Sequence, residues 1–207
     1  MKIVALFTLT IFFSFCSAQV FPSDLTDKDI PVTWLGLDCT EMRIVVSDAD
    51  DIKWPQADVL SRMWNNKVAG NRKLYPLHKA FHRKTVNKNI DFIQSLNEQE
   101  MVETWITKDI YLLYSENIKR AFERYQFTGE GVGYSFLIES IDLIQRDFSG
   151  YMIAIDLEQQ RMIKTYYLKA RFPYMLEGEE LIEPFRQVLV EFAEVLTRKS
   201  EEFEYSE

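Results

Sequence analysis

The runs YSFLIESI (residues 134–141), YMIAIDL (151–157) and MIKTYYL (162–168) decide the fold, because they follow one another with little chain between them. Each run is rich in β-branched and aromatic residues, which are typical of strands. A short polar segment at residues 158–161 joins the second run to the third and predicts a β-hairpin. The sequence therefore predicts three consecutive strands.

A long amphipathic helix follows these strands. Its apolar stripe at helical spacing consists of Leu181, Ile182, Phe185, Val188, Leu189, Phe192, Val195 and Leu196. Pro184 fits a helix only within its first turn. Burial of each such side chain contributes about 1.5–3 kcal/mol before the entropy cost, so the helix is expected to lie on a sheet or another helix.

The sequence before residue 134 predicts strands near the beginning of the domain, followed by helices. Residues 32–37 and 42–46 favour two short strands or one long strand with a bulge. A helix is predicted from Pro55 to Gly70.

Two further stretches leave alternatives open. Residues 77–96 are compatible with helical pieces interrupted near Asn87 and Asn89. Residues 110–125 carry one apolar stripe that predicts a helix, and Ser115 caps a shorter helix if the first part is a strand.

Together these elements predict one α/β (α+β) domain over residues 32–199. We expect a mixed or antiparallel sheet with helices packed on one face, ending in the β-hairpin and the C-terminal amphipathic helix. Residues 19–31 are expected to form a loosely ordered lead-in, and residues 200–207 a polar tail.

Residues 1–18 predict a cleavable signal peptide. Lys2 is followed by an uncharged apolar run and then by small residues, so cleavage is expected after Ala18. The run is shorter than the roughly 20 apolar residues that span a bilayer. We therefore expect an exported protein, periplasmic or extracellular, that is not an integral membrane protein. A lipid on Cys16 is the alternative, which bulky Phe15 disfavours.

Charge is distributed unevenly along this acidic chain, whose net charge is −8. Residues 59–90 contain no acidic side chain, whereas ten glutamates follow residue 176. The basic stretch predicts either a solvated face or a surface for an acidic partner, such as an envelope protein or an anionic cell-surface polymer. The candidate partner-binding residues are Arg72, Lys73, Lys79, Arg83, Lys84 and Lys88. Nucleic acid is disfavoured as a partner because the exported chain is acidic overall.

His78 and His82 could share one face of a helix, but the sequence nominates no third ligand for a metal. The acidic turn formed by Asp48, Asp50 and Asp51, with Asp38 nearby, lacks the regular spacing of a calcium loop.

Other candidate chemistry is equally unspecific. Glycines 129, 131 and 133 predict a turn and not a phosphate loop, because a strand follows them. Once the signal is removed, Cys39 is the remaining cysteine, expected to be buried or else to act as a nucleophile beside a histidine. Two of the aspartates at 142, 147 and 156 could form an acid–base pair, but a chain with 32 acidic residues offers many accidental pairs. The late aromatic residues are expected to fill the core or to line a ligand groove, and they are Tyr134, Phe136, Phe148, Tyr151, Tyr166, Tyr167, Phe172 and Tyr174.

Two segments carry a resemblance to known proteins. The arrangement of strand, hairpin and covering helix over residues 131–196 resembles that of bacterial envelope proteins with an anticodon-binding-domain-like α/β fold. The phrase WLGLDCT (34–40) resembles an opening strand of uncharacterised exported bacterial proteins. This resemblance implies a fold and supplies no catalytic motif.

The function expected from these observations is a non-catalytic binding or interaction module of the cell envelope, for which no cofactor, metal ligand or catalytic residue is nominated. Two alternatives remain, namely a carrier of a small apolar ligand or lipid and a hydrolase of unrecognised type.

Overall fold

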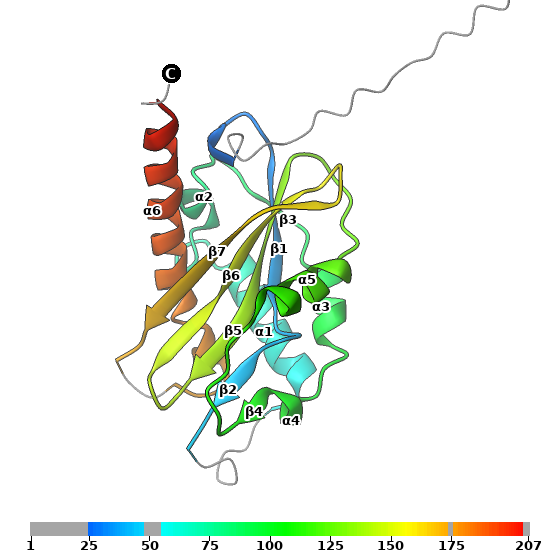
Figure 1. Ribbon diagram of the computed structural model, residues 1–207, viewed down its shortest axis with the longest axis vertical. Coiled ribbons are helices and arrows are strands. Elements are labelled where there is room, and N and C mark those ends of the chain that lie inside the picture. Colours follow the sequence, from blue (N-terminus) through cyan, green and yellow to red (C-terminus); the bar gives the residue numbers. More distant parts are fainter. Residues whose placement is uncertain (1–24, 48–54, 174–175, 205–207) are drawn as a thin grey trace, which may run out of the picture.

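One seven-stranded sheet forms the centre of the molecule (Figure 1). The computed structural model describes residues 25–47, 55–173 and 176–204. The strands are β1 (Val32–Asp38), β2 (Arg43–Val45), β3 (Asn87–Lys88), β4 (Ile106–Thr107), β5 (Val132–Asp142), β6 (Asp147–Asp156) and β7 (Arg161–Arg171). The helices are α1 (Ala57–Gly70), α2 (Leu77–Ala80), α3 (Asp91–Asn97), α4 (Val102–Trp105), α5 (Ser115–Glu123), the 3₁₀ helix η2 (Gly178–Ile182) and α6 (Phe185–Glu204).

Strands β1 and β2 act as one interrupted strand beside β5. β1 pairs with the first half of β5, and β2 pairs with its last three residues. The side-chain amides of Asn65 and Asn97 bond to the backbone of Leu37 and Cys39 at 2.7–3.1 Å. The backbone groups that lack a strand neighbour near the break are therefore satisfied. Of the predicted alternatives, the two short strands are confirmed, and the bulge of this segment lies within β1 between Trp34 and Gly36.

The two halves of the sheet pair differently. All pairs made by β1, β2, β3 and β4 are parallel. β5, β6 and β7 form an antiparallel meander with two tight connections, and the last of these is the predicted hairpin. Gly131, with φ of 75°, makes the turn into β5, where a Cβ would lie 2.3 Å from the carbonyl oxygen of Pro31.

Helices cover both faces of the sheet. α1, α2 and α6 pack on one face, where Trp34, Phe81, Tyr134, Phe185 and Phe192 form an aromatic cluster. On the other face, α5 and part of α3 pack against side chains of β1, β5 and β6. Figure 1 shows α6 and α5 on opposite sides of the sheet.

The fold-class prediction has to be corrected. The α/β class holds, but the antiparallel alternative is wrong for β1 to β4, and the placement of the helices on one face is wrong. The reason is that β1 and β2 reach their neighbours through helical connections, which bring strands together in parallel. β3 and β4 are two residues long each, too short to leave a periodic pattern.

Several predicted boundaries also shift. The helix over 110–125 begins only at Ser115, with Tyr114 as its N-cap, and no strand precedes it directly. The stripe predicted from Leu181 is divided between η2 and α6, and Pro184 directly precedes α6. α6 continues to Glu204, into the predicted polar tail. Across the described ranges, no helix is long and apolar enough to cross a membrane.

Candidate functional site

The six predicted cations lie on one segment that leaves α1 and ends in β3. Five of them are exposed, namely Arg72, Lys73, Lys79, Lys84 and Lys88. Arg83 is buried, with 7% of its surface exposed. The Arg83 guanidinium is therefore held inside the protein, whereas the other five residues are exposed to solvent.

These six cations differ from the other two of the basic stretch. Arg62 pairs with Glu98 at 2.7 Å, and Lys67 lies 3.5 Å from Glu179 and 3.9 Å from Glu183. Among the residues that the structure describes, none of the six predicted cations has a carboxylate oxygen within 4.0 Å. Their positive charge is therefore not neutralised by direct ion pairs within this part of the chain.

Backbone carbonyls hold the Arg83 side chain in place. Its Nε donates to the carbonyl of Ile30 at 3.3 Å, and one terminal nitrogen donates to Leu25 at 3.3 Å. The other terminal nitrogen donates to Phe81 at 3.1 Å and to His82 at 3.4 Å. The guanidinium thus joins the lead-in before β1 to the turn after α2, and its orientation is set without a carboxylate.

Burial lowers the pKa of the Arg83 guanidinium, whereas nearby Tyr134 and Asp27 raise it. The group stays protonated, because a guanidinium is not deprotonated in proteins. Burial also raises the pKa of Tyr134, whose hydroxyl has no hydrogen-bond partner among the described atoms. The interior beside Arg83 therefore holds a buried cation and a neutral phenol.

A pocket of about 550 Å³ opens beside Arg83 and is called the Arg83 pocket below. Its lining brings Lys28, His82 and Lys84 together with Arg83, and Asp29 is the acidic residue in the wall. Lys28 comes from the lead-in, which no sequence pattern connects with the basic stretch. Three cations facing one carboxylate favour an anionic ligand.

A smaller pocket of about 140 Å³ lies on the other side of Thr85 and is called the His78 pocket. Arg72, His78 and Lys88 contribute to its wall, and Thr85 lines both pockets. The Lys88 ammonium donates to the carbonyl of Ala69. Four of the six predicted cations therefore line two adjacent pockets, whereas Lys73 and Lys79 line neither.

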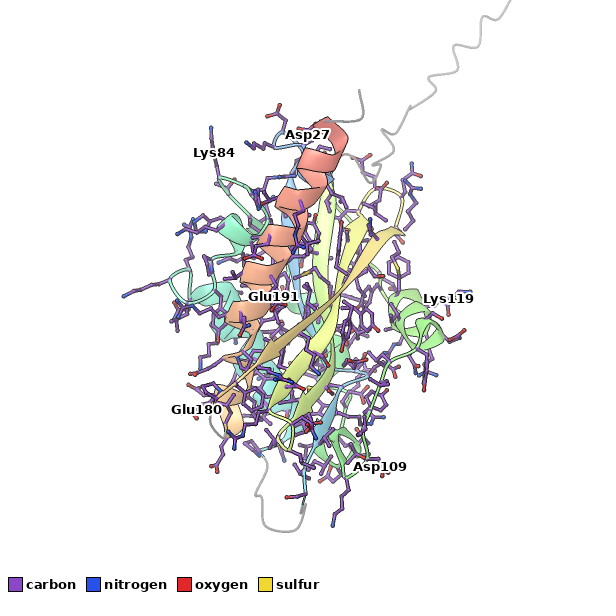
Figure 2. All side chains as sticks on the ribbon, turned by 60° about the vertical axis from the view of Figure 1, so that its left-hand side comes forward. Asp27, Lys84, Asp109, Lys119, Glu180 and Glu191 are labelled. Carbon is purple, nitrogen blue, oxygen red and sulfur yellow. The ribbon has the colours of Figure 1, made fainter. Side chains whose placement is uncertain are left out.

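Figure 2 shows how far this surface lies from other exposed cations. Lys84 projects beside the helix α6, and Lys119 projects from α5 on the opposite side of the molecule. Lys119 is exposed like Lys84, and its contact with Glu123 at 3.8 Å is a solvated surface pair that contributes little, so Lys119 offers a control position for the same change of charge.

The two histidines do not share a helix face. α2 ends at Ala80, and His82 has φ of 53° in the turn beyond it. The Nε2 atom of His82 lies 3.0 Å from the carbonyl of Ala193 in α6. The pair therefore lines two different pockets, and the described residues contain no group of three side chains suited to a metal ion.

Cys39 is fully buried at the end of β1. Burial raises the pKa of its thiol well above the ordinary value, and Asp38 and Glu100 add to this effect. Because the thiolate is the reactive form, these surroundings make Cys39 a poor nucleophile.

The carboxylates considered for catalysis have structural partners. Asp142 and Asp156 accept bonds from the backbone of the turns that follow them. Asp147 pairs with Lys169 at 2.7 Å and with Arg171 at 3.3 Å. The predicted acidic turn at 48, 50 and 51 lies outside the described residues.

Asp38 belongs to a buried network that the sequence did not indicate. Its carboxylate accepts bonds from the hydroxyl of Thr40 and the phenol of Tyr125, each at 2.6 Å. Burial, followed by the charge of Asp38, raises the pKa of Tyr125 well above its ordinary value. The network fixes the end of β1 to the chain just beyond α5, and a periodic pattern cannot reveal such a contact.

The late aromatic residues mostly fill the core, as one of the two readings predicts. Tyr134, Phe136, Phe148 and Phe172 are buried, Tyr151 and Tyr166 pack against the core while partly buried, and Tyr174 lies outside the described residues. An apolar groove of about 440 Å³ lies between the end of β7 and the start of α6, and Phe172 is the buried aromatic residue of this set that lines it. Its wall includes Leu74, Phe172, Leu176 and Val190.

No family model, curated protein or solved structure matches the chain in the three comparisons made with known proteins. The resemblance to exported bacterial envelope proteins stays a prediction.

Proposed function

We propose that this protein is an exported, non-catalytic binding module whose basic face holds an anionic polymer of the cell envelope. The Arg83 pocket and the His78 pocket each take one phosphate or carboxylate group of the polymer. The polymer then passes over Thr85, which lines both pockets.

One observation carries this proposal. A buried guanidinium is oriented by four backbone carbonyls in the wall of a pocket, beside two lysines and with one acidic residue in the lining. Desolvation of a cation costs free energy, and an anionic ligand would offset that cost by charge-assisted hydrogen bonds. Two adjacent pockets favour a polymer over a single ion, because linked groups bind with a high effective concentration.

Calorimetric titration with two kinds of probe tests the proposal. Inorganic polyphosphate supplies phosphate groups, polyglutamate supplies carboxylate groups, and orthophosphate and acetate are the corresponding single-group probes. We expect affinity per chain to rise more than in proportion to the number of anionic groups, because both pockets are filled only by a polymer.

Charge-reversal variants locate the binding. Lys84→Glu in the Arg83 pocket and Arg72→Glu in the His78 pocket should each weaken polymer binding about tenfold, because each replaces an attraction by a repulsion. Lys119→Glu is the control, since it changes the net charge equally on the other side of the molecule. Equal affinity in all three variants, or no binding of either polymer, would contradict the proposal.

Export is the second part of the proposal, supported by the pattern of residues 1–18. N-terminal sequencing of the protein recovered from its own cells should begin at Gln19. Recovery from the cytosol with Met1 still present would remove the envelope polymer as the partner.

The apolar groove supports a second candidate function, the carriage of a small apolar ligand. Its volume of about 440 Å³ falls in the range of small-molecule sites. Native mass spectrometry should then show added mass from a retained ligand, which Val190→Asp at the groove wall should abolish. Spectra of the protein alone would count against a carrier.

A further inference from the structure

The last strand of the sheet has no partner strand on one of its edges within the described ranges. β7 is eleven residues long and pairs with β6 alone among the described strands. Figure 1 shows β7 in gold at the end of the meander. At about 3.3 Å per residue such a strand offers more than 30 Å of edge.

An open edge presents backbone N–H and C=O groups that have no partner strand. A second chain in an extended conformation can satisfy these groups by adding a strand. The edge of β7 is thus a docking surface for extended backbone, and its side chains decide which chain fits.

The charged side chains of β7 are all cationic, namely Arg161, Lys164, Lys169 and Arg171. Asp156 and Asp147 of β6 contact three of them, at 3.7 Å from Arg161, 2.7 Å from Lys169 and 3.3 Å from Arg171. Lys164 lies 5.5 Å from the centre of the Tyr166 ring. Asp147 alone faces both Lys169 and Arg171, and Lys164 has no carboxylate oxygen within 4.0 Å among the described residues, so β7 carries uncompensated positive charge.

This charge pattern argues against a second copy of the chain as the partner. Pairing of two β7 strands with each other would bring the four cations of one copy alongside the four cations of the other. Like charges that face each other across strands are destabilising, whereas opposite charges stabilise the pair. An acidic strand therefore fits this edge and β7 itself does not.

We propose that β7 docks an acidic, extended segment of a partner protein, which adds to the sheet as a further strand. Backbone hydrogen bonds supply affinity, and acidic side chains opposite the cations of β7 supply selectivity. This surface is separate from the two cationic pockets, because no residue of β7 except Arg171 lines any pocket described above, and Arg171 lines the apolar groove.

The test uses a blocked peptide of about ten residues in which valine alternates with glutamate, long enough to cover most of β7. Its affinity is measured by fluorescence anisotropy, and backbone amides of β7 are followed by hydrogen exchange. We expect binding together with slower exchange at alternate residues of β7. A peptide with lysine in place of glutamate should bind at least about tenfold more weakly.

The decisive control keeps the charge and removes the hydrogen bonds. The same glutamate peptide with N-methyl groups on alternate residues cannot complete the strand, so its affinity should fall about tenfold or more. Equal affinity of the methylated peptide would show that only charge attracts it and would overturn the proposal.

Two variants separate this surface from the basic pockets. The double variant Lys164→Glu with Lys169→Glu reverses one cation on each face of β7 and should weaken peptide binding, whereas Lys84→Glu should leave it unchanged. If Lys84→Glu alone reduces binding, the peptide occupies the polymer site and the β7 proposal fails. If polymer binding fails while the peptide still protects β7, the proposed function falls and the β7 proposal stands.

Discussion

Arg83 has two roles at once, in packing and in the proposed binding. Its guanidinium bonds four carbonyls that come from the lead-in and from the turn after α2. It also lies in the wall of the Arg83 pocket. The four carbonyl dipoles replace part of the hydration that the guanidinium loses on burial. The cation can therefore stay buried without a carboxylate partner among the described residues.

Replacing Arg83 should therefore destabilise the fold. Arg83→Gln removes most of these bonds and leaves buried carbonyls without donors, so we expect the free energy of unfolding to fall by about 2–4 kcal/mol. Urea denaturation measures the change. Lys79→Gln, at an exposed position of the same segment, is the control and should stay within about 0.5 kcal/mol of the parent. A loss no larger than that of the control would show that the carbonyl contacts contribute nothing.

Cys39 should be unreactive in the folded protein. Its thiol pKa is raised above the ordinary value of 9.0, chiefly by burial, so the neutral thiol is favoured on folding. The stability that this contributes is present below pH 9 and is lost as the pH rises towards the folded-state pKa. Labelling with iodoacetamide at pH 8.5 should proceed only at the rate of unfolding. Rapid labelling of the native protein would reopen the hypothesis of a cysteine nucleophile.

At the scale of the elements, the break between β1 and β2 depends on two helices. Asn65 of α1 and Asn97 of α3 both bond the backbone of Leu37, and Asn97 also accepts the N–H of Cys39. The helices therefore replace the strand neighbour that the short β3 does not provide along the whole of β1.

Asn97→Ala tests this role. It leaves the Cys39 N–H buried without an acceptor and removes one donor to the Leu37 carbonyl, so we expect a loss of about 2–3 kcal/mol in the free energy of unfolding. The amide of Cys39 should also exchange faster than in the parent protein. Gln99→Ala, on the exposed side just after α3, serves as the control. An unchanged exchange rate at Cys39 would contradict this account of the break.

The elements with strong periodicity were predictable, and those held by single contacts were not. The meander of β5 to β7, the helix α1 and the long helix near the C-terminus follow from apolar patterns in the sequence. Strands β3 and β4 pair through backbone alone over two residues each, so no side-chain pattern marks them. At the site, the cations of residues 72–88 were predicted, but Lys28 joins them only because β3, at the end of the basic segment, pairs with β1, which directly follows the lead-in.

At the scale of the whole molecule, the fold keeps the glutamates that follow residue 176 out of ion-pair distance of the cations at residues 72–88, among the described residues. The glutamates of η2 and its neighbourhood neutralise Lys67, but they leave the residues around Thr85 without carboxylate partners among the described residues. The net charge of −8 is therefore compatible with a local cationic face, because at about 0.15 M salt charges more than roughly 8 Å away are largely screened. The β7 edge adds a second cationic surface with a different geometry.

The measurement that tests the central claim most directly is a titration of the ¹⁵N-labelled protein with inorganic tripolyphosphate, followed by amide chemical shifts. We predict that the largest shifts fall on residues 28–32 and 82–88, which form the walls of the two pockets around Thr85, with smaller shifts at Arg72 and His78. In the Lys84→Glu variant the shifts should require about tenfold more tripolyphosphate, whereas in Lys119→Glu they should be unchanged. Shifts centred on β7 or on the apolar groove, or no shifts at all, would contradict the assignment of this basic face as an anion-binding site.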